Sequence, residues 1–320
     1  MTSHSPESIK NKKISAIIAC YRDGQAIPFM HERLTKTFKE IGCKYEIIFV
    51  NDGSPDNSEA VLDKIAEADH NVVAITHSRN FSSQNAFFSG LTVSTGDSAV
   101  FLDGDLQDPP EVIKEFAQKW MEGFDVVYGV RVKRDASLSL RVGFKAFYWI
   151  FSKLSYIKIP RDAGDFGLID RKVIDVILSM PEKDLFIRGM RAWAGYKQVG
   201  VPYFRPERMF GVTTNSFWKN VRWAKKGVFS FSYEPLEFIF YLSLVTFCIA
   251  LIGIITYISF YFVYPDQPRG ITTIIVLILF FSSVQLLSIS IIGEYLGRIF
   301  EEVKDRPRFV VKKILNKPKK

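Results

Sequence analysis

Residues 99–110 read Ala99-Val100-Phe101-Leu102-Asp103-Gly104-Asp105-Leu106-Gln107-Asp108-Pro109-Pro110. This stretch begins with an apolar run that is typical of a buried β-strand, and the polar residues that follow mark the end of that strand. Pro110 suits the first turn of a helix, because its ring fixes φ near the helical value. The stretch therefore predicts a strand, a polar loop and a helix, the unit from which parallel sheets are built.

The same alternation extends over residues 14–128. Short apolar runs rich in β-formers predict strands at residues 14–20, 45–50, 72–76, 98–102 and 125–128. Segments with helical spacing between them predict helices at residues 26–41, 58–68, 84–93 and 110–121. Repeated units of this kind predict an α/β fold with a mainly parallel sheet flanked by helices.

Polar or charged residues follow each predicted strand. Ligands of open α/β sheets bind beyond the carboxyl ends of the strands, so these residues are the first candidates for a functional site. They are Tyr21-Arg22-Asp23-Gly24, Asn51-Asp52-Gly53-Ser54, Ser78-Arg79-Asn80, Asp103-Gly104-Asp105 and Gly129-Val130-Arg131.

Asp103 and Asp105 form the most informative of these groups. Residues two apart in an extended chain point the same way, so both carboxylates can face one pocket. Two carboxylates beside a diphosphate provide oxygen ligands of the kind that Mg²⁺ or Mn²⁺ requires. The two aspartates are therefore the expected metal ligands, and an ordinary polar turn is the alternative.

Two uncharged runs near the C-terminus, residues 238–263 and 271–293, exceed the roughly 20 residues that cross about 30 Å of hydrocarbon. We expect both to span a membrane; the alternative is a pair of buried helices in a soluble protein. Lys and Arg gather before the first run and after the second, whereas Arg269 alone lies between them. The positive-inside rule predicts that both termini and the main domain face the cytoplasm.

The remaining composition agrees with this picture. Much of the net charge of +8 lies beside the predicted spans, where it would attract anionic lipid headgroups, and no nucleic-acid-binding motif accompanies it. Cys20, Cys43 and Cys248 are widely spaced and are expected to be free thiols in a reducing compartment. The first dozen residues are polar and lack the apolar region of a signal peptide.

Aromatic and basic residues interleave at residues 137–159 and 215–232. Beside a membrane span, this pattern favours helices that lie in the bilayer interface, and core packing with a basic outer face is the alternative for the first stretch. The predicted domains are a polar tail at 1–12, a cytoplasmic catalytic domain at 13–210, an interfacial amphipathic segment at 211–235, two membrane helices within 236–296 and a basic cytoplasmic tail at 297–320.

Four segments together resemble family-2 glycosyltransferases of the GT-A type, in the branch of bactoprenol glucosyltransferases and dolichyl-phosphate mannosyltransferases. Residues 101–111 read FLDGDLQDPPE and resemble the DADLQDPPE segment of these enzymes. Residues 51–56 resemble their DDGSxD motif, and Arg79-Asn80-Phe81 resembles their RNFG motif. Residues 205–232 are similar to the R-x-x-G-x-S-K segment and the interfacial stretch that follows it in the bactoprenol branch. The resemblance covers nearly the whole chain.

The resemblance implies roles for individual residues. A nucleotide-sugar site would be formed by Tyr21, Asp23, Asp52, Asp103, Gly104, Gln107 and Arg131. The residues that carry catalysis would be Asp103, Asp105, Arg131, Asp162 and Asp165, with Asp105 and Asp103 on the Mg²⁺ or Mn²⁺ ion. Asp162 and Asp165 could orient a sugar hydroxyl or an arginine, or could simply shape a turn.

The sequence departs from the family pattern at two places. The usual Pro-x-Tyr-Asn-Glu reads Ala19-Cys20-Tyr21-Arg22-Asp23, and the usual Ser-Lys reads Thr213-Thr214. A phosphate-binding lysine is therefore missing from its usual place. By the resemblance, Arg208 would hold the acceptor phosphate, and the cations that could replace the missing lysine are Arg141, Arg205 and Lys219.

The expected activity is the inverting transfer of a hexose, glucose from UDP-glucose, to polyprenyl phosphate at the cytoplasmic face of a membrane. The acceptor phosphate is largely ionised at neutral pH, so no strong general base is needed. A GDP-mannose-dependent mannosyltransferase is the alternative. More distant alternatives are a processive polysaccharide synthase, whose Gln-x-x-Arg-Trp motif residues 188–193 match only weakly, and a non-catalytic membrane scaffold. The sequence leaves a homo-oligomer open.

Overall fold

The computed structural model of the chain describes residues 9–132, 163–207, 209–210, 232, 234–263 and 270–318. The chain forms two compact units. Unit 1 combines Met1–Tyr148, Ile157–Phe217 and Asp305–Lys320, and unit 2 combines Trp149–Tyr156 and Trp218–Lys304. The residues that follow the last helix thus belong to the same unit as the N-terminal half.

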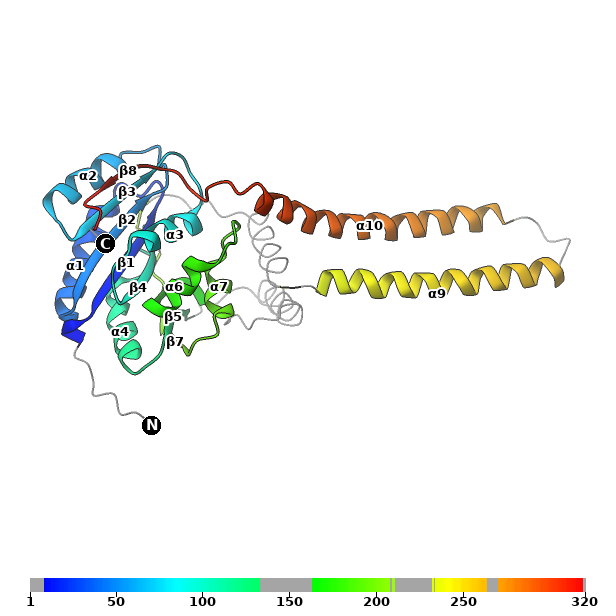
Figure 1. Cartoon of the computed structure of the whole chain (residues 1–320), viewed down its shortest axis with the longest axis horizontal. Helices are drawn as coiled ribbons and strands as arrows, with labels where there is room; N and C mark the ends of the chain where they lie inside the picture. The colour runs from blue at the N-terminus through cyan, green and yellow to red at the C-terminus, as the bar shows by residue number, and fades with distance from the viewer. Residues whose placement is uncertain are drawn as a thin grey trace. The chain divides into compact units, whose positions relative to one another are not determined.

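Unit 1 is built on a mixed sheet with the strand order β7-β5-β6-β4-β1-β2-β3-β8 (Figure 1). Its strands are β1 (Lys13–Cys20), β2 (Lys44–Asn51), β3 (Val72–His77), β4 (Ser98–Asp103), β5 (Val126–Arg131), β6 (Ala163–Asp170), β7 (Gln198–Tyr203) and β8 (Val311–Leu315). The central β4, β1, β2 and β3 are parallel, as are β5 and β7. Strands β6 and β8 pair antiparallel with their neighbours.

Helices cover both faces of this sheet. They are α1 (Ile27–Ile41), α2 (Ser58–Ala68), α3 (Ser83–Val93), α4 (Ile113–Met121), α6 (Arg171–Ser179) and α7 (Ile187–Trp193), with short 3₁₀ turns η1 (Ile9–Asn11) and η2 (Pro110–Val112). The central strands are buried on both faces, which explains their continuous apolar sequences. The predicted α/β fold with a mainly parallel, helix-flanked sheet is confirmed.

Strands β6, β7 and β8 were not predicted. Strand β6 contains two glycines, and a Cβ at Gly167 would lie 2.6 Å from the carbonyl oxygen of Val127, so its backbone must pack closely against β5. Strand β7 contains Gly200 and Pro202, both of which weaken a strand pattern. Strand β8 lies within residues 297–320, for which the sequence predicted a basic cytoplasmic tail.

Unit 2 contains two long helices, α9 (Glu234–Val263) and α10 (Ile271–Val303). Their large apolar side chains are exposed, as Phe240 at 63% and Leu286 at 68% illustrate. This exposure is the opposite of what the alternative of buried soluble helices requires. By length and composition both helices are candidate membrane spans, and α10 runs past the predicted boundary at residue 293.

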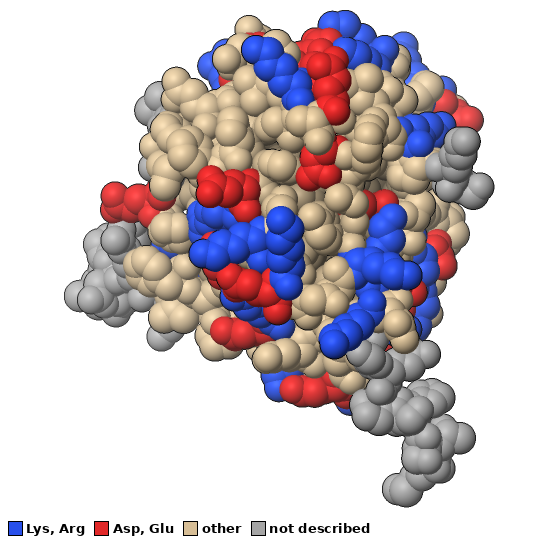
Figure 2. Space-filling view, turned by 90° about the vertical axis from the view of Figure 1, so that its left-hand side faces the viewer, with Lys and Arg blue, Asp and Glu red and all other residues tan. Residues whose placement is uncertain are grey.

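Acidic and basic side chains are interspersed on the face of the molecule that Figure 2 draws. The face drawn in Figure 2 does not present one large area of a single sign. Ion pairs join elements of unit 1, including Arg33 with Glu111, Lys312 with Glu59 and Lys313 with Asp63. Exposed pairs of this kind each contribute about 0–1 kcal/mol.

Candidate active site

The candidate site lies where the parallel strands β4, β1 and β2 end side by side. Backbone hydrogen bonds from Asp52 to Cys20 and from Gly104 to Ala19, both 2.9 Å, join the three strand ends. The sequence groups that follow these strands are therefore neighbours in space. A Cβ at Gly104 would lie 2.8 Å from Asp23 Oδ2, so glycine lets the acidic loop approach Asp23.

The loop after β1 is held against the loop after β2. Asp23 Oδ2 accepts a hydrogen bond from the amide of Tyr21 at 2.9 Å, and the amide of Arg22 donates to Ser54 Oγ at 2.7 Å. Arg22 adopts a left-handed backbone conformation with φ of 62°, which reverses the chain at this point. The reversal leaves Tyr21 partly exposed beside a fixed carboxylate.

Asp52 is buried and has two hydrogen bonds on one oxygen. Its Oδ1 lies 2.9 Å from His77 Nδ1 and accepts the amide of Phe81 at 2.8 Å. These partners come from the end of β3 and from the Arg-Asn-Phe segment that follows it. The sequence indicated Asp52 as a site residue but did not indicate His77 as its partner.

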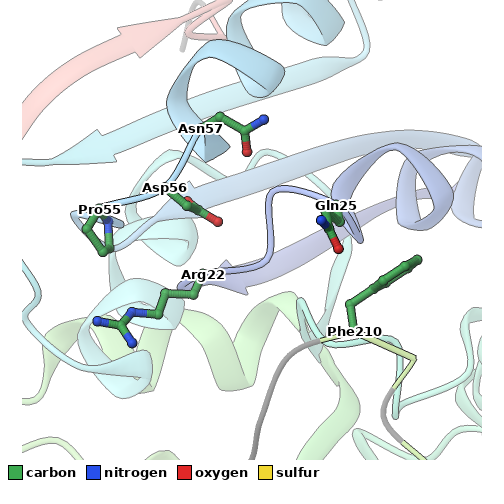
Figure 3. A pocket seen from close by; sticks show the side chains of 6 residues that line it. All are labelled: Arg22, Gln25, Pro55, Asp56, Asn57 and Phe210. Carbon is green, nitrogen blue, oxygen red and sulfur yellow. The ribbon is translucent and has the colours of Figure 1, made fainter.

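A pocket of about 400 Å³ adjoins the loop after β1. Its lining residues, shown in Figure 3, are Arg22, Gln25, Pro55, Asp56, Asn57 and Phe210. Partial burial would raise the pKa of Asp56, but hydrogen bonds from Ser54 and Ser58 hold it below its usual value. Arg22 is the one residue of the predicted strand-end groups that lines this pocket; Tyr21, Asp23 and Asp52 lie nearby on the loops after β1 and β2.

The acidic loop after β4 gathers three carboxylates. Asp105 and Asp108 are 5% and 2% exposed, whereas 43% of the Asp103 side chain is accessible. Leu106 has a φ of 61°, and this left-handed residue turns the loop back on itself. The amide of Gln107 donates to Asp105 Oδ1 at 3.1 Å, which fixes that carboxylate at the start of the turn.

The three carboxylates of this loop have little positive charge near them. Partial desolvation in the loop and the neighbouring carboxylates of Asp108 and Asp105 raise the pKa of Asp103 above its usual value. Desolvation also raises the pKa of Asp108, although Arg205 opposes it. Arg205 is near both, with its guanidinium nitrogens 4.0 Å from Asp103 Oδ2 and 4.0 Å from Asp108 Oδ1. A divalent cation would relieve this repulsion.

The residues present fit such a cation only together with a ligand that supplies further oxygens. No group of three or more His, Cys, Asp or Glu side chains suited to a metal ion occurs among the described residues. The protein would therefore supply one or two carboxylates, and phosphate oxygens and water would complete the coordination.

Tyr203, at the end of β7, links the acidic loop to Arg131. Its hydroxyl donates to Asp108 Oδ1 at 2.8 Å, and Arg131 Nε lies 3.4 Å from the same hydroxyl. The loop also binds the chain after β7, because Gln107 Nε2 donates to the carbonyl oxygen of Pro206 at 3.3 Å. The contacts of residues 203–206 thus bring Arg131, Arg205 and Gln107 together near Asp108. Tyr203 was missed because only the position of β7 reveals it.

Asp165, on β6, is bound by an arginine. Arg188 Nε donates to its Oδ1 at 3.0 Å and Gln84 Nε2 donates to its Oδ2 at 3.0 Å. Burial would raise the pKa of Asp165, but the charge and hydrogen bonds of Arg188 hold it below the usual value. This geometry favours the orientation of an arginine over the alternative roles that the sequence left open for Asp165.

Other predicted site residues cannot be placed. Asp162, Arg141, Arg208 and Lys219 lie outside the described residues, as does most of the predicted interfacial segment.

The chain belongs to glycosyl transferase family 2, whose model matches residues 15–178, the part of the chain that includes the strand-end carboxylates Asp52, Asp103 and Asp105. It is 37% identical over 303 residues to a bactoprenol glucosyl transferase of Shigella phage SfII, covering 94% of this chain and 98% of that one. It is 36% identical over 304 residues to a prophage bactoprenol glucosyl transferase homolog of Escherichia coli K12. That match covers 94% of this chain and 99% of the relative. The protein is thus a glycosyltransferase.

A similar structure is that of a mannosyltransferase from Pyrobaculum calidifontis, solved in complex with GDP-Man and Mn²⁺. The two chains are 13% identical, the match covers 95% of this chain and 91% of that one, and the TM-score is 0.45.

Proposed function

We propose that the protein transfers glucose from UDP-glucose to a polyprenyl phosphate, with inversion at the anomeric carbon. The observation that carries this proposal is the acidic loop Asp103–Asp108 with Arg205 beside it, in a chain that continues into two candidate membrane spans. Such a chain can bring a soluble nucleotide-sugar to an acceptor that stays in the membrane. Relatives that match it over nearly their whole length are named bactoprenol glucosyl transferases, which supports glucose and a polyprenyl acceptor.

The donor would bind across the ends of β4, β1 and β2. Tyr21, Asp23 and Asp52 hold the base and ribose in this proposal, with Asp103 and Gly104 beside the nucleoside. Asp105 and Asp103 would hold Mg²⁺ or Mn²⁺, which would supply positive charge to neutralise the diphosphate.

The sugar-diphosphate would meet Gln107, which belongs to the acidic loop, and Arg131, which lies near that loop because Tyr203 contacts both Arg131 and Asp108. Arg205 is the best-placed described cation for the acceptor phosphate, because it already lies between Asp103 and Asp108. Arg208, Arg141 and Lys219 are further candidates by sequence.

The reaction would be a single displacement. An ionised oxygen of the acceptor phosphate attacks the anomeric carbon, a new carbon–oxygen bond forms, and the bond to the diphosphate breaks with its electron pair leaving on UDP. No proton is transferred, so the protein's work is to position two substrates and to stabilise the leaving group. An α-linked donor would give a β-linked lipid phosphate.

Localisation follows from the same proposal. The catalytic unit and both termini would face the cytoplasm, with α9 and α10 as the two spans. The polyprenyl chain stays in hydrocarbon, so the donor pocket must lie near headgroup level.

The test is a panel of donors. Purified full-length protein in lipid nanodiscs receives radiolabelled UDP-glucose, UDP-galactose, UDP-N-acetylglucosamine or GDP-mannose with undecaprenyl phosphate and Mg²⁺. We expect label in the lipid fraction from UDP-glucose, and β configuration by NMR of the product. Label from GDP-mannose alone would favour the mannosyltransferase alternative, and label from none of the donors would overturn the proposal.

A further inference from the structure

The segment after the second candidate span returns to the sheet and becomes its edge. Strand β8 pairs antiparallel with β3, and Ile314 lies opposite Ile75. The amide of Ser78 donates to the carbonyl oxygen of Val310 at 2.9 Å, which extends the pairing beyond the end of β3. A register shift falls between Thr76 and His77, at the point where β3 reaches the candidate site.

Contacts anchor this segment at both of its ends. The guanidinium of Arg308 donates to the carbonyl oxygens of Met180 and Glu182 at 2.6 and 2.9 Å. At the other end, Asn316 Nδ2 donates to the carbonyl oxygen of Val72 at 3.0 Å. Residues 308–316 are therefore a fixed part of unit 1, which we name the return strand.

The return strand places one aromatic ring next to the candidate site. Phe309 stacks on the imidazole of His77, with ring centroids 5.2 Å apart and planes inclined by 14°. Phe81 meets the same imidazole edge-on, at 5.7 Å and 86°. The His77 side chain has no exposed surface. Its orientation is thus set by rings from two different segments.

His77 in turn holds Asp52. Its Nδ1 lies 2.9 Å from Asp52 Oδ1, and its Nε2 is buried with no hydrogen-bond partner among the described residues. An ionised carboxylate can only accept, so the hydrogen bond between the two side chains requires a proton on Nδ1. His77 is therefore a fixed donor to this carboxylate.

The backbone around Asp52 allows little adjustment. A Cβ at Gly53 would lie 2.3 Å from the carbonyl carbon of Arg79, so the loops after β2 and β3 are in direct backbone contact. Both hydrogen bonds of the Asp52 carboxylate come from the second of these loops or from the end of β3. Any shift of His77 is thus transmitted to the orientation of the carboxylate.

We propose that His77 and Phe309 are positioning residues for Asp52, and that the return strand is in this way a structural part of the donor nucleotide site. The inference rests on the proposed function, in which Asp52 contacts the nucleoside. A carboxylate that accepts hydrogen bonds from a sugar or base must be oriented to within a few tenths of an ångström. The return strand supplies that orientation from the far end of the chain.

The experiment compares four variants of the full-length protein in nanodiscs. His77→Phe keeps an aromatic ring but removes the hydrogen bond to Asp52, whereas His77→Asn places an amide donor close to the position of Nδ1. Phe309→Leu keeps an apolar side chain but removes the flat stacking surface. Lys312→Ala is the matched control, since Lys312 lies on the same strand and pairs with Glu59 at 2.9 Å instead of contacting His77.

Four quantities are measured for each variant. They are the dissociation constant of UDP with Mg²⁺ by calorimetric titration, the Michaelis constants for UDP-glucose and undecaprenyl phosphate, and the melting temperature. We expect His77→Phe and Phe309→Leu to weaken UDP binding by about tenfold, the equivalent of one misplaced hydrogen bond. The Michaelis constant for UDP-glucose should rise by a similar factor, and the Michaelis constant for undecaprenyl phosphate should not change. His77→Asn should recover part of the loss, and Lys312→Ala should match wild type.

The outcomes that overturn the inference are distinct from those that overturn the proposed function. If wild type binds UDP but His77→Phe and Phe309→Leu bind it equally well, the return strand has only a structural role, even if the melting temperature falls. A parallel rise in the acceptor constant would also contradict donor-site positioning. If wild type neither binds UDP nor uses UDP-glucose, the proposed function itself is wrong.

Discussion

Arg188 forms a bidentate ion pair with Asp165: Nε donates to Oδ1 at 3.0 Å and Nη2 donates to Oδ2 at 3.2 Å. Gln84 adds a third hydrogen bond and, through its own Oε1, accepts the amide of Ile187 at the start of α7. The carboxylate therefore joins β6, α3 and α7. The fully buried Arg191 lies near enough to contribute to the low pKa of Asp165.

We predict that Asp165→Asn lowers the free energy of unfolding by about 2–4 kcal/mol at neutral pH, because it leaves two partly or fully buried arginines without a counter-charge. Chemical denaturation of the detergent-solubilised protein measures the change. The control is Asp175→Ala, whose carboxylate is 64% exposed and 3.9 Å from Arg171, and which should change stability by less than about 1 kcal/mol. Equal stability of Asp165→Asn and wild type would contradict the prediction.

The same ion pair should give a pH dependence of known sign. The pKa of Asp165 is lower in the folded state than its ordinary value of 3.8, so its stabilising contribution is complete above that value. The contribution is lost as the pH falls through the folded pKa. The stability difference between wild type and Asp165→Asn should thus be constant from pH 7 to about 5 and shrink below about pH 4. A difference that grows on acidification would show that burial, and not Arg188, dominates at Asp165.

The first half of the sheet was predictable because its signals are local. Strand β4 and the turn into α4 are encoded within residues 98–121, as an apolar run, a polar loop and a proline, and the observed bounds agree closely. The carboxyl-end rule then identified Asp52 and Asp103 without any knowledge of their partners. Parallel order alone brings such residues together.

The partners of those residues could not be predicted, because they are distant in sequence. Tyr203 and Asp108 are 95 positions apart, and Asp165 and Gln84 are 81 positions apart. Neither contact leaves a periodic pattern. The return strand was not predicted for another reason. Residues 311–315, Val-Lys-Lys-Ile-Leu, have the positive charge that is typical of a tail beside a membrane, yet the two lysines pair with acidic residues of α2.

We predict that Asp105→Ala abolishes sugar transfer and leaves the protein folded. Asp105 is the more buried of the two proposed metal ligands, so its loss would release the cation from the diphosphate. Turnover is measured in wild type and variant with Mg²⁺, with Mn²⁺ and with chelator, beside the melting temperature. Substantial turnover of the wild type in the presence of chelator would contradict the assignment of Asp105 and Asp103 as ligands of a required metal, regardless of the activity of the variant.

We predict that residues 266 and 317 label from opposite sides of the membrane. Strand β8 shares a sheet with β3, so Lys317 lies on the same side of the membrane as the catalytic unit. With α9 and α10 as two spans, residue 266 would lie on the opposite side. Residue 266 lies outside the described residues. Single cysteines at Asp266 and Lys317, in a background without Cys20, Cys43 and Cys248, would be tested with a membrane-impermeant maleimide on oriented vesicles. Labelling of both from one side would refute two spans.

Arg205 is the cation that we expect to bind the acceptor phosphate. Arg205 lies 4.0 Å from both Asp103 and Asp108, too far for a strong hydrogen bond to either. Its guanidinium is thus attracted to the acidic loop, yet two phosphate oxygens could still engage it in a bidentate pair. Arg205→Ala should raise the Michaelis constant for undecaprenyl phosphate by an amount equivalent to about 1–3 kcal/mol, with a smaller change in donor affinity. Arg208→Ala should act in the same direction.

The measurement pairs the apparent Michaelis constant for the lipid with direct titration of UDP in each variant. Arg33→Ala is the control, because it removes a partly exposed arginine that pairs with Glu111 at 2.6 Å and leaves Asp103 and Asp108 untouched. Arg205→Lys separates charge from geometry: a point charge should restore the attraction to phosphate but not the bidentate contact, so recovery should be partial. If UDP affinity collapses in Arg205→Ala and lipid dependence is unchanged, Arg205 belongs to the nucleotide-sugar pocket, and another cation must receive the acceptor phosphate.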